Sequence, residues 1–147
     1  MKSLLASLMM LLAAAAPAAA QSAWGDLDGL LMRSLTAGTP MEGAFWLPDA
    51  PDPSTAREAI GVAYTHIPGS AGSLSISVGY FVRQNGQFVL SGIISDLFGH
   101  NPRQPVFAPD HMAITTTTLR PDEPRCCPTG ETTWIIDRRS LRAVAAN

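Results

Sequence analysis

The chain contains little lysine and little cysteine. Its one lysine is Lys2, so the other basic residues are nine arginines, which are scattered among 12 acidic residues and leave a formal net charge of -2. A nucleic-acid-binding domain needs clustered basic residues, and an amphipathic membrane-binding helix needs a Lys- or Arg-rich polar face. The charge pattern therefore predicts neither a nucleic-acid partner nor a membrane-surface segment.

Long apolar runs are absent after residue 20, but one opens the chain. Lys2 is followed by an apolar stretch from Leu4 to Ala16 and then by three alanines that end at Ala20, a pattern typical of a signal peptide cleaved before Gln21. The stretch is shorter than the roughly 20 residues that cross a bilayer. We expect residues 1–20 to be removed, the remainder to be periplasmic or secreted, and no stable membrane insertion after cleavage.

The remaining chain of about 127 residues is long enough for one domain with its own core. Residues 21–53 join a segment from Trp24 to Thr36, which is compatible with one short helix, to a stretch interrupted by four prolines. We expect these residues to form an N-terminal arm of helix and loop that lies on a β-rich globular domain at 54–147.

Asn85-Gly86 is the strongest local signal. Both central residues of a type I′ turn need positive φ, so this dipeptide predicts a hairpin between strands at 73–84 and 87–96. Counting outward from the turn places Gly79 opposite Gly92. Two facing glycines either let the sheet bend or admit another piece of chain or a ligand, and bending is the favoured interpretation.

The other strands are expected from β-branched and alternating runs. The spacing of Thr55 and Glu58 also suits a helix start, but we favour a strand from about Ile60. Prolines predict a loop at 97–109. The remaining strands are expected at 113–119, 132–137 and 141–145. The sequence therefore predicts an α+β or mainly β fold, a single antiparallel meander sheet of five or six strands with its N-terminal arm.

Cys126 and Cys127 are adjacent and are the only cysteines. In an oxidising compartment they bond to each other, pair across chains, bind metal or stay reduced. Two adjacent thiolates without a further ligand at zinc spacing do not make a metal site, and catalytic pairs are usually spaced as Cys-x-x-Cys. We interpret the pair as a candidate disulfide inside one loop, with a structural role favoured over a redox one.

Three histidines and two aspartates are the other candidates for chemistry. His66 with Asp96 and His100, or Asp110 with His111, have the residue types of an acid–base pair or of a carboxylate-oriented metal ligand. No metalloprotease or hydrolase motif contains them, so they are more simply explained as turn residues. The sequence thus predicts no catalytic residue, no metal and no cofactor.

Several segments resemble a group of small exported bacterial proteins of unknown function. The similarity covers about residues 60–140 and is carried by Val78-Gly79-Tyr80-Phe81, by the 97–103 loop, by the threonine-rich strand at 114–119 and above all by Asp122 to Gly130, with its Cys-Cys-Pro-Thr segment, followed by Trp-Ile-Ile-Asp at 134–137. The resemblance implies a fold and an exported location. It transfers no catalytic residue.

We therefore expect an exported soluble protein that acts as a non-enzymatic binding or interaction domain in the cell envelope, with an envelope protein or a small ligand as its partner. The alternative is a small periplasmic enzyme or a redox-responsive protein that uses Cys126 and Cys127. An enzyme would gather His66, His100 or the cysteines around a carboxylate in a cleft, whereas a binding domain would present a flat or grooved surface.

Overall fold

The computed structural model describes residues 23–146, so the expected signal peptide and its cleavage point between Ala20 and Gln21 lie outside the described residues. Within residues 23–146 the chain forms one named helix and eight strands. These are α2 (Leu27–Leu35), β1 (Gly43–Pro48), β2 (Glu58–His66), β3 (Leu74–Gln84), β4 (Gln87–Ile94), β5 (His100–Phe107), β6 (His111–Thr118), β7 (Gly130–Asp137) and β8 (Ala143–Ala145).

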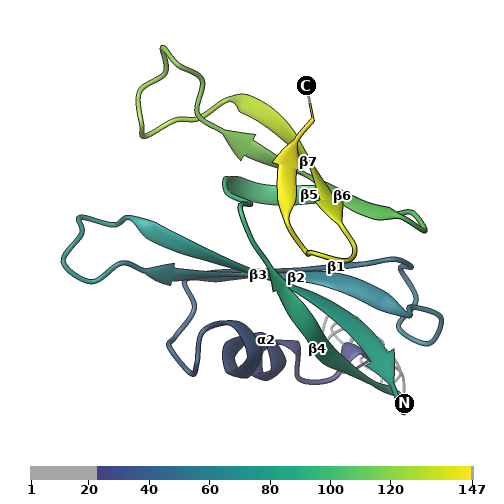
Figure 1. The fold of residues 1–147 in the computed structure, drawn as a ribbon. Coiled ribbons are helices and arrows are strands. Elements are labelled where there is room, and N and C mark those ends of the chain that lie inside the picture. The colour runs from purple at the N-terminus through teal and green to yellow at the C-terminus, as the bar shows by residue number, and fades with distance from the viewer. Residues whose placement is uncertain (1–22, 147) are drawn as a thin grey trace, which may run out of the picture.

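The strands form two four-stranded antiparallel sheets, ordered β1-β2-β3-β4 and β5-β6-β7-β8. The sheets pack on each other, and α2 lies on the far side of the first sheet (Figure 1). The mainly β prediction and the short helix are confirmed. The single sheet of five or six strands is not matched, because two segments expected to be loops are strands and the chain after β4 crosses to a second sheet.

The two additional strands, β1 and β5, are both at sheet edges. β5 contains Pro102 and Pro105, which led us to expect a loop at 97–109. Proline cannot donate to a strand ladder but is tolerated on an edge strand and at bulges. The register of β5 against β6 shifts twice, and Asn101 and Gln104 have φ of 48° and 53°. Two bulges therefore keep the proline-containing segment in the sheet.

The main core lies between the two sheets. Strand β2 contributes its larger side chains to it, and its small residues face the other way, toward α2. The core residues are Ile60, Val62, Tyr64, Val78, Ile94, Leu97, Met112, Ile114, Trp134, Ile136 and Ala143. A Cβ on Gly61 would lie 2.5 Å from Cδ2 of Leu31, so the glycine allows the helix to approach the sheet closely.

The hairpin at Asn85-Gly86 is confirmed, with φ of 50° and 82° at the two turn residues. The predicted register holds only near the turn. It shifts between Tyr80 and Phe81, so Gly79 pairs with Ile93 rather than with Gly92. The expectation that two glycines face each other across this hairpin is therefore wrong, because a bulge inserts one extra residue in β4.

Gly79 instead pairs with Gly61 of β2, on the sheet face that receives α2. A Cβ on Gly79 would lie 2.7 Å from Cδ2 of Leu35 and 2.8 Å from Cδ1 of Leu90. The space above these two glycines is filled by another part of the chain, the helix α2. From the sequence, a bend of the sheet was favoured over such a close approach.

Replacing Gly86 by valine should lower the free energy of unfolding by about 1 kcal/mol or more, because a β-branched residue disfavours positive φ. Space is not the cause, since a Cβ there meets nothing within 4 Å. Gly43→Val is the matched control: Gly43 is also uncrowded, lies in β1 and has no positive φ. Urea unfolding should show a loss for Gly86→Val alone, and equal midpoints for both variants would contradict the turn assignment.

Candidate functional site

A polar cluster ties the first sheet to the second. Arg138, in the turn between β7 and β8, donates from Nη1 to Oε2 of Glu58 (2.8 Å) and from Nη2 to Oε1 (3.0 Å). Tyr80 donates from its hydroxyl to Oε2 of Glu58 (2.5 Å) and accepts from Nη1 of Arg138 (3.0 Å). Arg138 Nε also donates to the carbonyl of Ala108 (2.6 Å). The guanidinium is therefore held on three sides by groups from both sheets.

Burial and hydrogen bonding oppose each other at this cluster. Burial raises the pKa of Glu58, but the hydrogen bonds from Arg138 and Tyr80 outweigh it, and the net shift lowers the pKa below 4.5. Burial, together with the hydrogen bond to Glu58, raises the pKa of Tyr80. The hydrogen bonds to Glu58 raise the pKa of Arg138. Since each charged group is already fully engaged, the cluster acts as an inter-sheet clasp.

An exposed apolar row crosses the outer face of the second sheet. Val106, Ala113, Ile135 and Val144 lie directly opposite one another on β5, β6, β7 and β8. Opposite residues on neighbouring strands point to the same face. Three of the four are exposed, by 51% for Val106, 38% for Ile135 and 62% for Val144. We refer to these four residues as the apolar row.

Polar residues border the apolar row on both sides. On one side Thr115 and Thr133 share a hydrogen bond between their hydroxyls (3.0 Å). Beyond them Arg103 binds the Thr117 hydroxyl (3.1 Å) and forms an ion pair with Glu131. On the other side, His111 of β6 lies opposite Asp137 of β7. The outer face thus has an apolar centre between two polar borders.

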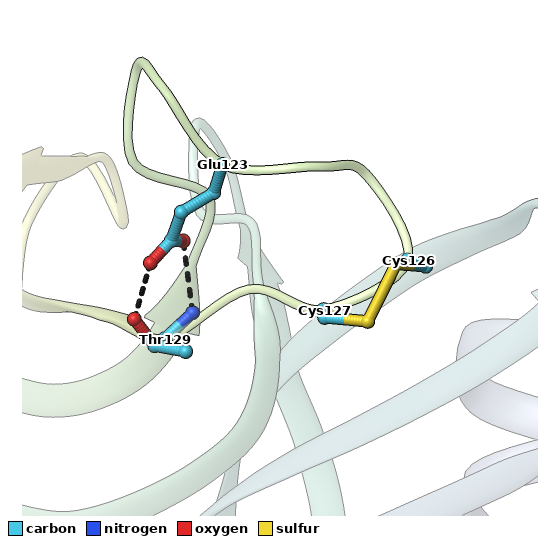
Figure 2. Close-up of a disulfide and its surroundings, with 4 residues drawn as sticks. All are labelled: Glu123, Cys126, Cys127 and Thr129. Carbon is cyan, nitrogen blue, oxygen red and sulfur yellow. Dashed lines mark hydrogen bonds between the residues drawn. A yellow bond between two sulfur atoms is a disulfide. The ribbon is translucent and has the colours of Figure 1, made fainter.

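A loop at residues 119–129, the disulfide loop, joins β6 to β7 just beyond the Arg103–Glu131 pair. At its tip Cys126 and Cys127 form a disulfide, and both residues are exposed (Figure 2). Glu123 reaches back from one arm of the loop to Thr129 on the other arm. Its carboxylate accepts from the backbone N–H of Thr129 (2.9 Å), the Thr129 hydroxyl and the backbone N–H of Arg120 (3.0 Å).

These hydrogen bonds favour the ionised carboxylate of Glu123. The Thr129 hydroxyl, then the Thr129 N–H and the Arg120 N–H, lower the pKa of Glu123 to about 2. Its stabilising effect on the loop is fully present above 4.5, the ordinary pKa of a glutamate, and is lost only as the pH falls through about 2. Glu123 therefore closes the disulfide loop at any ordinary pH.

The histidine and aspartate candidates differ in the contacts that they make. His66 is exposed at the end of β2. Asp96, which follows β4, pairs with Nε of Arg142 (2.7 Å). His100 stacks on Tyr64, with ring centroids 5.8 Å apart. Of the two expected groupings, the structure brings together the sequence neighbours Asp110 and His111, whose side chains lie 2.8 Å apart.

The described part of the chain, residues 23–146, contains no group of three or more His, Cys, Asp and Glu side chains that could hold a metal ion.

None of the helices within residues 23–146 has the length and apolar character needed to cross a membrane.

Sequence reasoning missed several residues whose side chains form hydrogen bonds between different parts of the fold. Glu58 and Arg138 are 80 positions apart, and no local pattern connects them. Glu123 lies close to the cysteine pair but was not among the candidate residues, because its partners Arg120 and Thr129 are fixed only by the folded loop. Arg103 was placed in a loop. Its role depends on the two bulges of β5, which bring its side chain to the outer face of the sheet.

No protein-family model, no curated protein and no solved structure matches this chain.

Proposed function

We propose that the chain is an exported binding domain that uses the outer face of the β5–β8 sheet to bind a protein of the cell envelope. The observation that carries the proposal is the apolar row of Val106, Ala113, Ile135 and Val144, which is continuous across all four strands and exposed at three of its four residues. The expected signal peptide at residues 1–20 supports the exported location.

The shape and borders of this face suit a protein better than a small ligand. Four strands spaced roughly 4.8 Å apart make the row about 14 Å long. Small molecules bind mostly in concave sites that enclose them, whereas protein interfaces have an apolar centre and a polar rim. The Thr115–Thr133 pair and the Arg103–Glu131 pair form such a rim on one side.

The two charges on one side of the rim also set a requirement for the partner. Arg103 and Glu131 already neutralise each other, so they favour a partner with polar or paired groups rather than one with a strong charge of either sign. The apolar row then forms the apolar centre of the interface. We expect a complex whose affinity changes little with salt, because screening acts mainly on unpaired surface charges.

Photo-crosslinking in the organism that encodes the chain tests the proposal. A photoreactive residue in place of Val144 should give an adduct with one envelope protein in the periplasmic or extracellular fraction. Val106→Asp, in the same row, should reduce the adduct by about tenfold, since burying one charge at an interface costs more than 1.4 kcal/mol. Mass spectrometry of the adduct would also show whether the chain begins at Gln21.

Ile93→Asp is the matched control, because Ile93 is 53% exposed but lies on β4 of the other sheet. It should leave the adduct unchanged. An adduct that survives Val106→Asp would place the interface elsewhere. An adduct between two copies of the chain would show that the face is a self-interface, and a cytoplasmic adduct with intact residues 1–20 would contradict the exported location.

A further inference from the structure

The disulfide between Cys126 and Cys127 connects no two parts of the fold. It joins sequence neighbours at the exposed tip of the disulfide loop. In the chain-entropy account, a disulfide stabilises a protein by closing a loop in the unfolded chain, and the effect grows with loop length. A bond between adjacent residues closes almost no chain, so this stabilisation is close to its minimum.

Glu123 performs the loop closure that a structural disulfide would provide. Its carboxylate binds the backbone N–H groups of Arg120 and Thr129, which lie on opposite arms of the loop (Figure 2). The N–H of Cys127 donates to the carbonyl of Pro124 (3.1 Å), which adds a turn around the cysteines. These contacts involve no sulfur atom, so the loop retains them whether the cysteines are oxidised or reduced.

The position of the cysteines also favours attack by a thiol. Both residues are exposed. Their Cα atoms are 3.8 Å apart, less than the roughly 4.4–6.8 Å usual for disulfides, because one peptide bond joins them. Access and a small ring both make a disulfide easier to reduce than one that links distant, buried segments.

We propose that Cys126–Cys127 is a thiol–disulfide exchange site that accepts two electrons reversibly from a protein dithiol of the Cys-x-x-Cys type. A thiolate of the dithiol attacks one sulfur, the Cys126–Cys127 bond breaks, and the released cysteine sulfur takes a proton. The second thiol of the partner then loses its proton and attacks the partner's own sulfur in the mixed disulfide, which breaks that bond, and the second cysteine sulfur of the chain takes up a proton. The chain leaves with two thiols, and the partner leaves with the disulfide.

This assignment does not depend on the proposed binding function, because it uses neither the apolar row nor a partner for it. It also favours a redox role of the cysteine pair over a structural one. A structural role was favoured from the sequence, where only the cysteines and the surrounding prolines and glycine marked the loop. The hydrogen bonds of Glu123 supply an alternative support for the loop and leave the disulfide free to react.

Native reduction tests the proposal, with dithiothreitol as the dithiol probe. The oxidised protein should be two hydrogens lighter than the dithiol form, and millimolar dithiothreitol should reduce it without denaturant. Oxidised dithiothreitol should restore the bond. The Tm should shift by less than about 2 °C between the two forms, because a larger shift in a domain of this size signals a real stability change. The Cys126→Ser/Cys127→Ser variant should retain the Tm of the wild type.

Limited trypsin digestion at the Arg125–Cys126 bond reports whether the reduced loop stays closed. In the reduced state Glu123→Ala should be cut about tenfold faster than the wild type, since local opening governs cleavage. Asp122→Ala, at the neighbouring exposed position, should be cut at the wild-type rate. A disulfide that resists dithiothreitol until the protein is denatured, or a reduced form whose Tm falls as far as that of Glu123→Ala, would overturn the proposal and make the bond structural.

Discussion

Gly99→Ala is expected to lower the free energy of unfolding by about 3 kcal/mol, from backbone strain and lost hydrogen bonds together. Gly99 lies where the chain crosses between the sheets and has a φ of 109°, which L-residues rarely adopt. A Cβ there would lie 2.5 Å from Oγ1 of Thr116 and 2.8 Å from the backbone oxygen of Thr117. Neither atom can move freely, because the Thr117 oxygen belongs to the backbone of β6 and the Thr116 hydroxyl is committed elsewhere.

The Thr116 hydroxyl holds the crossing in place. It donates to the carbonyl of Phe98 (2.8 Å) and accepts from Nε1 of Trp134 (2.8 Å), and Thr116 is fully buried. Next to it, the Tyr64 hydroxyl donates to the carbonyl of Gly99 (2.9 Å), and burial raises the pKa of Tyr64 to about 12. Displacing the hydroxyl of Thr116 would leave a buried donor or acceptor unpaired, at a cost of about 1–3 kcal/mol.

Gly72→Ala separates the two contributions. Gly72 has a φ of 92° in the loop between β2 and β3, and a Cβ there would meet nothing within 4 Å. It should therefore lose only the backbone contribution, about 1 kcal/mol. The measurement is urea unfolding of both variants under the same conditions. Equal losses at the two positions would show that the contacts of Gly99 with β6 contribute nothing.

Local signals predicted the local structure well. Asn85-Gly86 identified its turn because only a few residues tolerate two successive positive φ values. The alternating and β-branched runs identified the positions of β2, β3, β4, β6, β7 and β8, since a half-buried strand imposes that pattern. The segment from Trp24 to Thr36 contains α2, which Asp26 caps by accepting from the N–H of Gly29 (2.8 Å).

Features that depend on distant parts of the chain were not predicted. β1 and β5 are edge strands that contain proline. In a sequence, proline predicts a loop, and it fits a strand only where that strand is known to lie at the edge of a sheet. The bulge in β4, opposite Tyr80 and Phe81, moved the glycine pairing by one residue, and no turn-based count can detect such an insertion. A single sheet was expected because nothing local shows that the chain changes sheets after Ile94.

The candidate sites divide in the same way. The cysteine pair was visible because two adjacent residues carry it, and the structure joins them in a disulfide. The apolar row was not visible, because its four residues come from four strands and only the pairing aligns them. The clasp of Glu58, Tyr80 and Arg138 likewise needs both sheets in place.

Arg138→Met is expected to cost about 3 kcal/mol at neutral pH, near the lower end of the range for breaking one half of a buried ion pair. The lower end applies because the side chains of Arg138 and Glu58 are each 20% exposed rather than fully buried. The loss comes mainly from the carboxylate of Glu58, which would stay desolvated with only Tyr80 to bind it. Arg139→Met is the matched control on the exposed neighbour and should leave the unfolding midpoint unchanged.

The pH dependence of the clasp has a defined sign. The folded pKa of Glu58 lies below its ordinary value of 4.5, so the clasp contributes fully above 4.5 and is lost as the pH falls through the folded pKa. The stability difference between the wild type and Glu58→Gln should therefore be constant near neutral pH and shrink in acid. As the pH falls, the loss caused by Arg138→Met should begin to shrink at a higher pH than the loss caused by Glu58→Gln. The reason is that the unpaired, half-buried carboxylate of Glu58 takes up a proton more readily.

A double-mutant cycle with Glu58→Gln and Arg138→Met isolates the interaction itself. The two single losses should exceed the loss in the double variant by about 2 kcal/mol, because the double variant leaves no unpaired charge. Losses that simply add, or an Arg138→Met loss that does not change between neutral and acidic pH, would show that Arg138 stabilises the fold through packing on the ring of Tyr80, 5.7 Å away, and not through the charge of Glu58.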